Sequence, residues 1–111
     1  MLEFRVSQPN HVTLIEVSGR VDSMNANELG DVLSEQIELG ARQIVLDLSK
    51  VSYMSSAGLR ELVTAYRKLQ EVSGDLRLAQ PASRVMDVLE MSGLDTIFQI
   101  FSTQVEAVGS Y

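Results

Sequence analysis

The strongest constraint on the fold of this chain is the order in which two kinds of apolar pattern follow one another. Two strand-type segments come first, at residues 2–6 and 12–18, and helix-type and strand-type segments alternate after them. A strand followed by a helix and another strand forms a right-handed crossover and a parallel pair. The pattern therefore predicts an α/β fold of order ββαβαβαβα, with a mixed, mostly parallel sheet of about four or five strands.

The later segments are distinguished by their periods. Apolar residues recur every three or four positions along the helix-type segments, which gives each of them one apolar face. Ile44-Val45-Leu46 is instead a continuous apolar run, typical of a strand buried on both faces. We expect strands over 43–48, 76–79 and 96–101, and helices over 26–39, 57–73, 82–91 and 103–108.

Local signals mark several element ends. Residues 8–11 form a turn, which makes the first two strands a hairpin. Gly19 is expected to begin the exit from the second strand. Asn25 and Glu28 have the spacing of a capping box at a helix start. Gly40 and Gly93 suit helix C-terminal caps.

Length bounds the organisation of the chain. With 111 residues it is long enough for one domain and too short for two, so we expect a single domain over residues 1–111. No apolar run reaches the roughly 20 residues of a membrane-spanning helix. The first five residues alternate apolar with charged side chains and lack the apolar region of a secretory signal, which predicts a cytoplasmic protein without a membrane partner.

Composition narrows the chemistry. The chain has no cysteine and a single histidine, His11 in the hairpin turn, so we expect no metal centre and no thiolate catalysis. Nine basic against fifteen acidic residues give a net charge of −6, which argues against a nucleic-acid partner. The motifs of phosphate-binding loops and of serine hydrolases are absent. We therefore expect no cofactor and no enzymatic activity.

Scattered carboxylates are the remaining candidates for acid–base chemistry. Their spacing does not require any two of them to meet, and we expect solvated surface groups rather than an acid–base pair. These residues are Asp22, Asp31, Asp47, Glu61 and Asp75.

The unusual segment is residues 47–60, which leaves a buried strand and enters the longest helix. Its small residues Ser55, Ser56, Ala57 and Gly58 lie at the expected helix start, where unpaired backbone N–H groups and the helix dipole favour an anion such as phosphate. Serine is also a preferred N-cap. The residues alone leave both interpretations open, a structural cap or a functional serine.

At this segment the sequence resembles the STAS family, named for sulfate transporters and anti-sigma factor antagonists. The antagonists follow an Asp-Leu-Ser-like strand end with an aromatic residue, Met, Asp, Ser, Ser or Thr, Gly and Leu, and residues 53–59 match this run as Tyr-Met-Ser-Ser-Ala-Gly-Leu. Residues 18–22 resemble the family's Gly-x-Leu-Asp turn, and residues 89–94 its landmark before the final strand. The landmarks follow the family's order over nearly the whole chain.

The resemblance implies a phosphorylation site. The acceptor in phosphorylated antagonists is the first serine after the motif's Asp, which corresponds to Ser56. The sequence departs from the family motif at the two positions that flank Ser56. Ser55 replaces the Asp, and Ala57 replaces the second Ser or Thr. Ser55 is accordingly the second choice of acceptor.

The resemblance also implies partners and a mechanism. An unphosphorylated antagonist binds an anti-sigma factor, usually a serine kinase, and so releases a sigma factor. The kinase phosphorylates the antagonist and a PP2C-type phosphatase resets it. An alternative is a STAS scaffold in a stress-sensing or lipid-transport complex. A nucleotide-hydrolysing enzyme is a third alternative, which a turnover assay with ATP and GTP would test.

The loops after the second and third strands should gather at one edge of a parallel sheet. We therefore expect a partner-binding face around Ser56 that includes the helix residue Arg60. The expected contact residues are Asp22, Ser23, Met24, Asn25, Ser55, Ser56, Ala57, Gly58 and Arg60.

Overall fold

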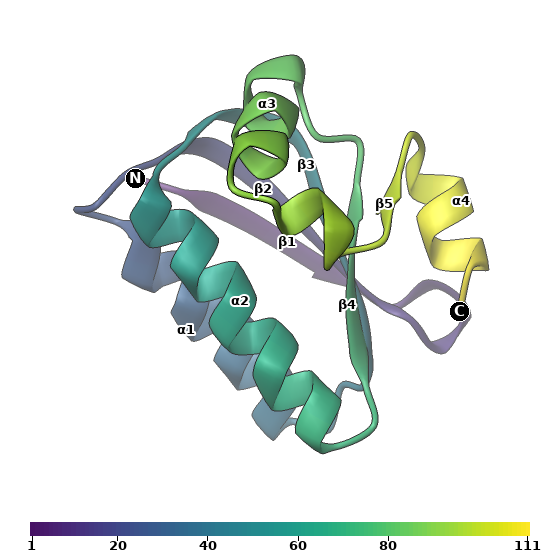
Figure 1. Ribbon diagram of the computed structural model, residues 1–111. Coiled ribbons are helices and arrows are strands. Elements are labelled where there is room, and N and C mark those ends of the chain that lie inside the picture. The colour runs from purple at the N-terminus through teal and green to yellow at the C-terminus, as the bar shows by residue number, and fades with distance from the viewer.

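A computed structural model describes residues 1–111 as one five-stranded sheet with helices on both faces (Figure 1). The strands are β1 (Glu3–Ser7), β2 (Thr13–Val21), β3 (Gln43–Met54), β4 (Asp75–Ala79) and β5 (Ile100–Phe101). The helices are α1 (Ala26–Glu38), α2 (Ser56–Glu71), α3 (Ser83–Met91) and α4 (Gln104–Gly109), with short 3₁₀ turns at Pro9–His11 and Leu94–Thr96. The predicted order of strands and helices is confirmed.

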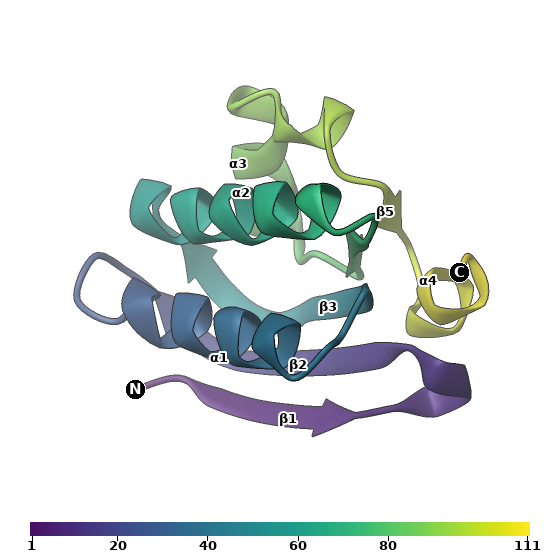
Figure 2. The same cartoon turned by 90° about the horizontal axis from the view of Figure 1, so that it is seen from below.

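The strands lie side by side in chain order. β1 pairs with β2 antiparallel, and β2, β3, β4 and β5 follow as parallel neighbours. Right-handed crossovers between consecutive parallel strands place α1, α2 and α3 on one face of the sheet. Figure 2 shows α1 and α2 side by side on this face and α4 apart from them. No helix is both long enough and apolar enough to cross a bilayer.

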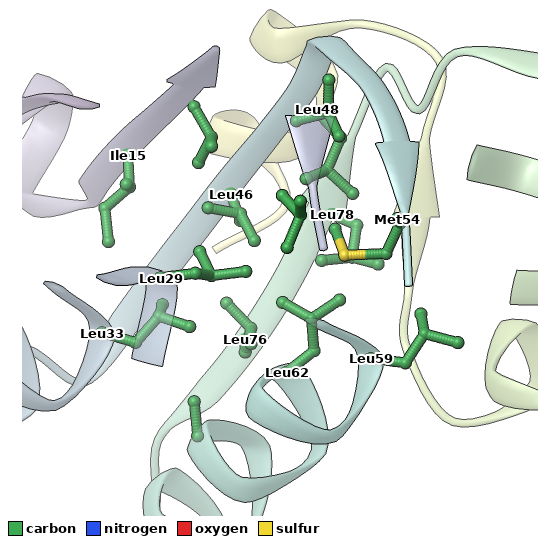
Figure 3. Packing of buried hydrophobic residues seen from close by; sticks show 14 of the residues in the cluster. Ile15, Leu29, Leu33, Leu46, Leu48, Met54, Leu59, Leu62, Leu76 and Leu78 are labelled. Atoms are coloured by element: carbon green, nitrogen blue, oxygen red, sulfur yellow. The ribbon is translucent and has the colours of Figure 1, made fainter. Parts of the chain in front are cut away.

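Two apolar clusters hold the layers together. The larger contains 21 buried residues and fills the space between the sheet and α1, α2 and α3. In Figure 3 the leucines of α1 and α2 point toward those of β3 and β4, with Met54 and Leu59 at one end. The smaller cluster contains five buried residues and lies beneath α4: Val12, Leu14, Val45, Ala79 and Ala107.

Two strands are longer than the sequence predicts. β3 extends to Met54 instead of ending near Leu48, and β2 continues through Gly19 to Val21. Gly19 has a φ of 125°, a conformation open to glycine, and the register between β2 and β3 shifts directly after it. The expected exit from the strand at Gly19 is therefore wrong, because Gly19 is accommodated as an irregularity within β2, which keeps its pairing with β3 as far as Val21.

The last strand is shorter than predicted. Of the expected strand over 96–101, only Ile100–Phe101 pairs with β4. Before it the chain forms the 3₁₀ turn Leu94–Thr96, and the ring of Phe98 packs edge-on against Tyr66 of α2, with centroids 5.2 Å apart. Phe98 is drawn into the helix layer of the core, and the backbone before it does not stay in the sheet.

Most helix-end predictions hold. Gly40 and Gly93 follow the ends of α1 and α3 with positive φ, as expected of glycine after a helix. The capping box at Asn25 and Glu28 is wrong, because the Asn25 side chain makes no cap bond. Glu28 Oε1 instead accepts from the backbone N–H of Leu2 over 3.3 Å.

Candidate functional site

The ends of β2 and β3 bring the two predicted partner-binding segments together. Val21 pairs with Met54 at the end of the ladder, and the backbone N–H of Ser55 donates to the carbonyl of Val21 over 2.9 Å. The turn after Val21 and the start of α2 after Ser55 therefore leave the sheet side by side. Figure 1 shows this edge at the end of α2 nearer the N-terminus of the chain.

Two bulges in β3 shape the approach to α2. Between the Glu16–Asp47 and Ser18–Lys50 pairs, β3 contains one residue more than β2, and the same happens between the Gly19–Val51 and Arg20–Tyr53 pairs. Each extra residue bends the strand and increases its twist. The bulges re-aim the end of β3 before it passes into α2.

Asp47 stabilises the first bulge from within the protein. Its Oδ1 accepts from the backbone N–H of Ser49 over 2.8 Å, and its Oδ2 accepts from the side-chain amides of Gln80 at 3.0 Å and Gln104 at 2.7 Å. Asp47 is only 3% exposed. The expectation of a solvated carboxylate is therefore wrong for Asp47, because Gln80 directly after β4 and Gln104 at the start of α4 supply the donors that water would have supplied.

The two neighbouring serines at the start of α2 lie in different surroundings. Ser55 is the N-cap, half-buried, and its Oγ accepts from the backbone N–H of Gly58 over 3.2 Å. Ser56 is the first helical residue and its side chain is exposed. The structural interpretation, a helix cap, therefore applies to Ser55. Ser56 is exposed and is the serine left available for the functional interpretation.

Gly58 lies where the first turn of α2 packs on the strand ends. It is buried, and a Cβ added there would lie 2.7 Å from Cγ1 of Val21 and closer still to the sulfur of Met54. Ala57 beside it is half-buried. The helix can approach the strand ends this closely because position 58 has no side chain.

The turn over residues 22–25 is held by side chains from both of its ends. Asp22 Oδ1 accepts from the backbone N–H groups of Met24 at 2.9 Å and Asn25 at 3.2 Å. Asn25 is buried, and its side chain accepts from the N–H of Asp22 and donates to the carbonyl of Arg20. Asp22 and Asn25 therefore position the turn, whose exposed residues are Ser23 and Met24.

The exposed side chains at this edge are of the kinds that protein interfaces favour. Met24 is 88% exposed, and Ser56 and Arg60 are exposed on α2. Arg20 lies over the ring of Tyr53, 4.2 Å from its centroid. Met, Arg and Tyr are enriched at protein interfaces. The residues alone could not reveal the Arg20–Tyr53 pair, because it depends on the shifted register of β2 and β3.

The local charge differs from that of the whole chain. The first turn of α2 contains no acidic side chain, and Arg60 follows in the second turn. The positive end of the helix dipole is therefore not neutralised by a carboxylate in the first turn of α2. A negative group added to Ser56 would meet favourable electrostatics there.

Other residues with possible chemistry lie elsewhere. His11 is exposed in the hairpin turn, as expected, and lines a hollow with Leu39 after α1 and Ser73 after α2, at the end of α2 opposite Ser56. Asp31 is exposed on α1, whereas Glu61 and Asp75 are half-buried. No group of three or more His, Asp or Glu side chains is placed to hold a metal ion.

The comparisons with known proteins agree in family. The sequence model of the STAS domain family matches residues 3–107 of this chain. BtrV of Bordetella bronchiseptica, named as a candidate anti-sigma factor antagonist, is 36% identical over 95 residues, which cover 86% of this chain and 82% of BtrV. The anti-sigma-B factor antagonist of Staphylococcus aureus is 30% identical over 93 residues, covering 83% of this chain and 86% of that protein.

The fold is also found among solved structures. The anti-sigma factor antagonist SpoIIAA in its unphosphorylated form superposes with a TM-score of 0.82 at 23% identity, over 96% of this chain and 93% of SpoIIAA. The phosphorylated form of SpoIIAA, described as a Bacillus cell fate determinant, superposes with a TM-score of 0.75 at 23% identity, over 97% and 98% of the two chains. At this identity the likeness concerns the fold.

Proposed function

The chain belongs to the STAS domain family, and within that family we infer that it acts as an anti-sigma factor antagonist controlled by phosphorylation of Ser56. The observation that carries this proposal is the exposed hydroxyl of Ser56 at the first position of α2, beside a neighbour whose own hydroxyl is occupied as the helix cap. The names of the relatives support the regulatory, non-enzymatic class of function.

The proposed cycle takes place in the cytoplasm and has two states. Unphosphorylated protein binds an anti-sigma factor that is also a serine kinase, which frees a sigma factor. The kinase transfers the γ-phosphoryl group of ATP to Oγ of Ser56, the hydroxyl proton is lost, and ADP leaves. A PP2C-type phosphatase hydrolyses the phosphate ester and restores the first state.

The fold should tolerate the phosphate, so the switch acts at the partner surface. Phosphorylation adds about −1.5 to −2 charges, which the N-terminus of α2 accommodates through its dipole and N–H groups. The phosphate would also lie in the face made by Met24, Arg60 and the turn over 22–25. When a partner docks on this face, the phosphate must lose its water or be repelled by negative charge on the partner, and both weaken binding. A loss of ~3 kcal/mol in binding free energy corresponds to more than a hundredfold in affinity.

The test combines affinity capture with two variants at Ser56. A serine kinase captured from the native cell should bind wild type and Ser56→Ala alike, and should add one phosphate to wild type only. Ser56→Asp should fold normally and bind the kinase more weakly, because its carboxylate is favourable at a helix N-terminus but adds charge to the interface. Capture of partners without any kinase that modifies either serine would overturn this proposal and favour the scaffold alternative.

A further inference from the structure

Ser56 and Arg60 lie on the same side of α2. They are four positions apart in a regular helix that runs from Ser56 to Glu71, and both side chains are exposed. Residues at this spacing are neighbours on a helix surface, with Cβ atoms roughly 5 to 6 Å apart. An arginine side chain spans that distance easily, so its guanidinium can meet a group attached to the Ser56 oxygen.

The guanidinium of Arg60 has no competing partner. The one ion pair of the structure joins Arg77 to Asp75, and Arg60 takes part in side-chain hydrogen bonding only through its backbone carbonyl, which accepts from the hydroxyl of Thr64 over 2.9 Å. No acidic residue lies in the first turn of α2. Arg60 therefore lies one turn from Ser56 as an unpaired cation.

We propose that Arg60 receives the phosphate of phosphorylated Ser56 within the same helix, which turns an interface cation into an internal counter-ion. This inference rests on the proposed phosphorylation of Ser56. Arginine binds phosphate through two parallel N–H···O bonds, and such charge-assisted bonds are stronger than neutral ones. Phosphorylation then changes the partner face twice, because it adds an anion at position 56 and withdraws the guanidinium of Arg60 from a docking partner.

The pair also explains why Ser56, rather than Ser55, suits this role. Four residues after Ser55 is Leu59, which is buried in the core cluster, so a phosphate on Ser55 would find no cation one turn along. A phosphate there would also esterify the Oγ that accepts from the backbone N–H of Gly58. Arg60 lies one turn after Ser56, so only a phosphate on Ser56 has a cation at this spacing.

The experiment measures the phosphate directly by ³¹P NMR. Full-length protein with phosphoserine installed at position 56 during translation is titrated between pH 4 and pH 8, beside the same protein carrying Arg60→Gln. A neighbouring cation favours the dianion, so the second phosphate pKa of the wild-type background should lie about 0.2 to 0.4 units below that of the Arg60→Gln background. The N–H groups of α2, Arg20 and Asp22 are present in both proteins and cancel in the comparison.

Two controls sharpen the test. Arg67→Gln removes an exposed cation from the same helix, eleven residues and about 16 Å along the axis from Ser56, and should leave the phosphate pKa within ~0.1 unit of the wild-type background. Arg60→Lys keeps the charge and should retain part of the shift. Raising the salt concentration to about 1 M should shrink the wild-type shift.

Equal phosphate pKa values in the wild-type and Arg60→Gln backgrounds would overturn this inference, as would an equal effect of Arg67→Gln. Because the phosphoserine is installed during translation, neither result depends on finding a kinase. Failure of the pair leaves the proposed switch standing, and failure of every kinase to modify Ser56 leaves the measured pair standing.

Discussion

The backbone N–H of Gly58 donates to Oγ of Ser55 over 3.2 Å, and this bond gives the two neighbouring serines different tasks. The Ser55 hydroxyl satisfies a donor that the first turn of a helix leaves unpaired. The Ser56 hydroxyl does not cap the helix, and Ser56 is exposed to solvent. The replacement of the family's Asp by Ser55 therefore keeps the helix cap and removes one negative charge beside Ser56.

We predict that the cognate kinase and ATP add one phosphate, mapped to Ser56 by mass spectrometry. Ser55→Ala should still be phosphorylated, and should lose about 1 kcal/mol of unfolding free energy through the missing cap, measured by urea denaturation. Ser56→Ala should accept no phosphate and should keep its stability. Phosphate that disappears in Ser55→Ala and persists in Ser56→Ala would move the acceptor to Ser55.

Arg60→Glu should weaken binding of the unphosphorylated protein to the anti-sigma factor by about tenfold or more, because rim charges at an interface act on association and affinity. Its melting temperature should stay nearly unchanged, since the side chain is exposed and makes no ion pair. Arg84→Glu, an exposed position on α3, makes the same change of net charge and should bind as wild type. Calorimetric titration that finds the two variants equal would remove Arg60 from the interface.

Gly58→Ala should destabilise the protein by about 1 to 3 kcal/mol, although alanine stabilises an ordinary helix interior. The added Cβ would meet Val21 at 2.7 Å and the sulfur of Met54, both within the packed core. Gly30→Ala is the matched control, because the three atoms nearest to its Cβ would all belong to the flexible carboxylate end of Glu61. Thermal denaturation should rank Gly58→Ala below wild type and Gly30→Ala at or above it. The reverse order would show that α2 can shift away from the strands.

Asp47→Ala should lower the unfolding free energy on the order of 2 to 3 kcal/mol, because it leaves the N–H of Ser49 and the amide of Gln80 without their acceptor and the amide of Gln104 with only the long contact to Glu16 at 3.5 Å. Asp31→Ala removes an exposed carboxylate from α1 and should change stability by less than about 0.5 kcal/mol. Denaturation in urea measures both. Similar midpoints for the two variants would mean that solvent replaces the buried acceptor at Asp47.

Tyr111 should make stability sensitive to alkaline pH. Burial, with Asp75 as the second cause, raises the pKa of its hydroxyl well above the ordinary value. A raised pKa in the folded state means that the stabilisation is complete below the unfolded pKa of about 10 and is lost as pH rises beyond it.

The contribution of Tyr111 is isolated by comparison with Tyr111→Phe. The wild type should lose stability more steeply than this variant above about pH 10. At neutral pH the variant should be less stable by about 1 kcal/mol, because the hydroxyl contacts the carbonyls of Ile44 and Asp75 at 2.8 and 2.6 Å. Parallel stability profiles from pH 7 to pH 11 would contradict a buried, protonated hydroxyl.

The sequence alone determined the order of the elements and the place of the serine pair at a strand-to-helix junction. Apolar periodicity is a property of neighbouring residues, so it predicts strands and helices without knowledge of what they pack against. Gly40 and Gly93 mark helix ends for the same local reason. The same pattern placed the serine pair at the start of a helix, and the resemblance at residues 53–59 singled out Ser56, but neither could assign different environments to Ser55 and Ser56.

Tertiary structure decided which polar groups are buried and where the strands end. Asp47 is an ordinary carboxylate in the sequence, and only the closing of Gln80 and Gln104 over it makes it a buried acceptor. The Asn25 side chain forms hydrogen bonds with the backbone of Arg20 and Asp22 instead of capping its own helix. Such roles depend on which segments meet across the sheet, because an acceptor that loses water must take its donors from distant parts of the chain.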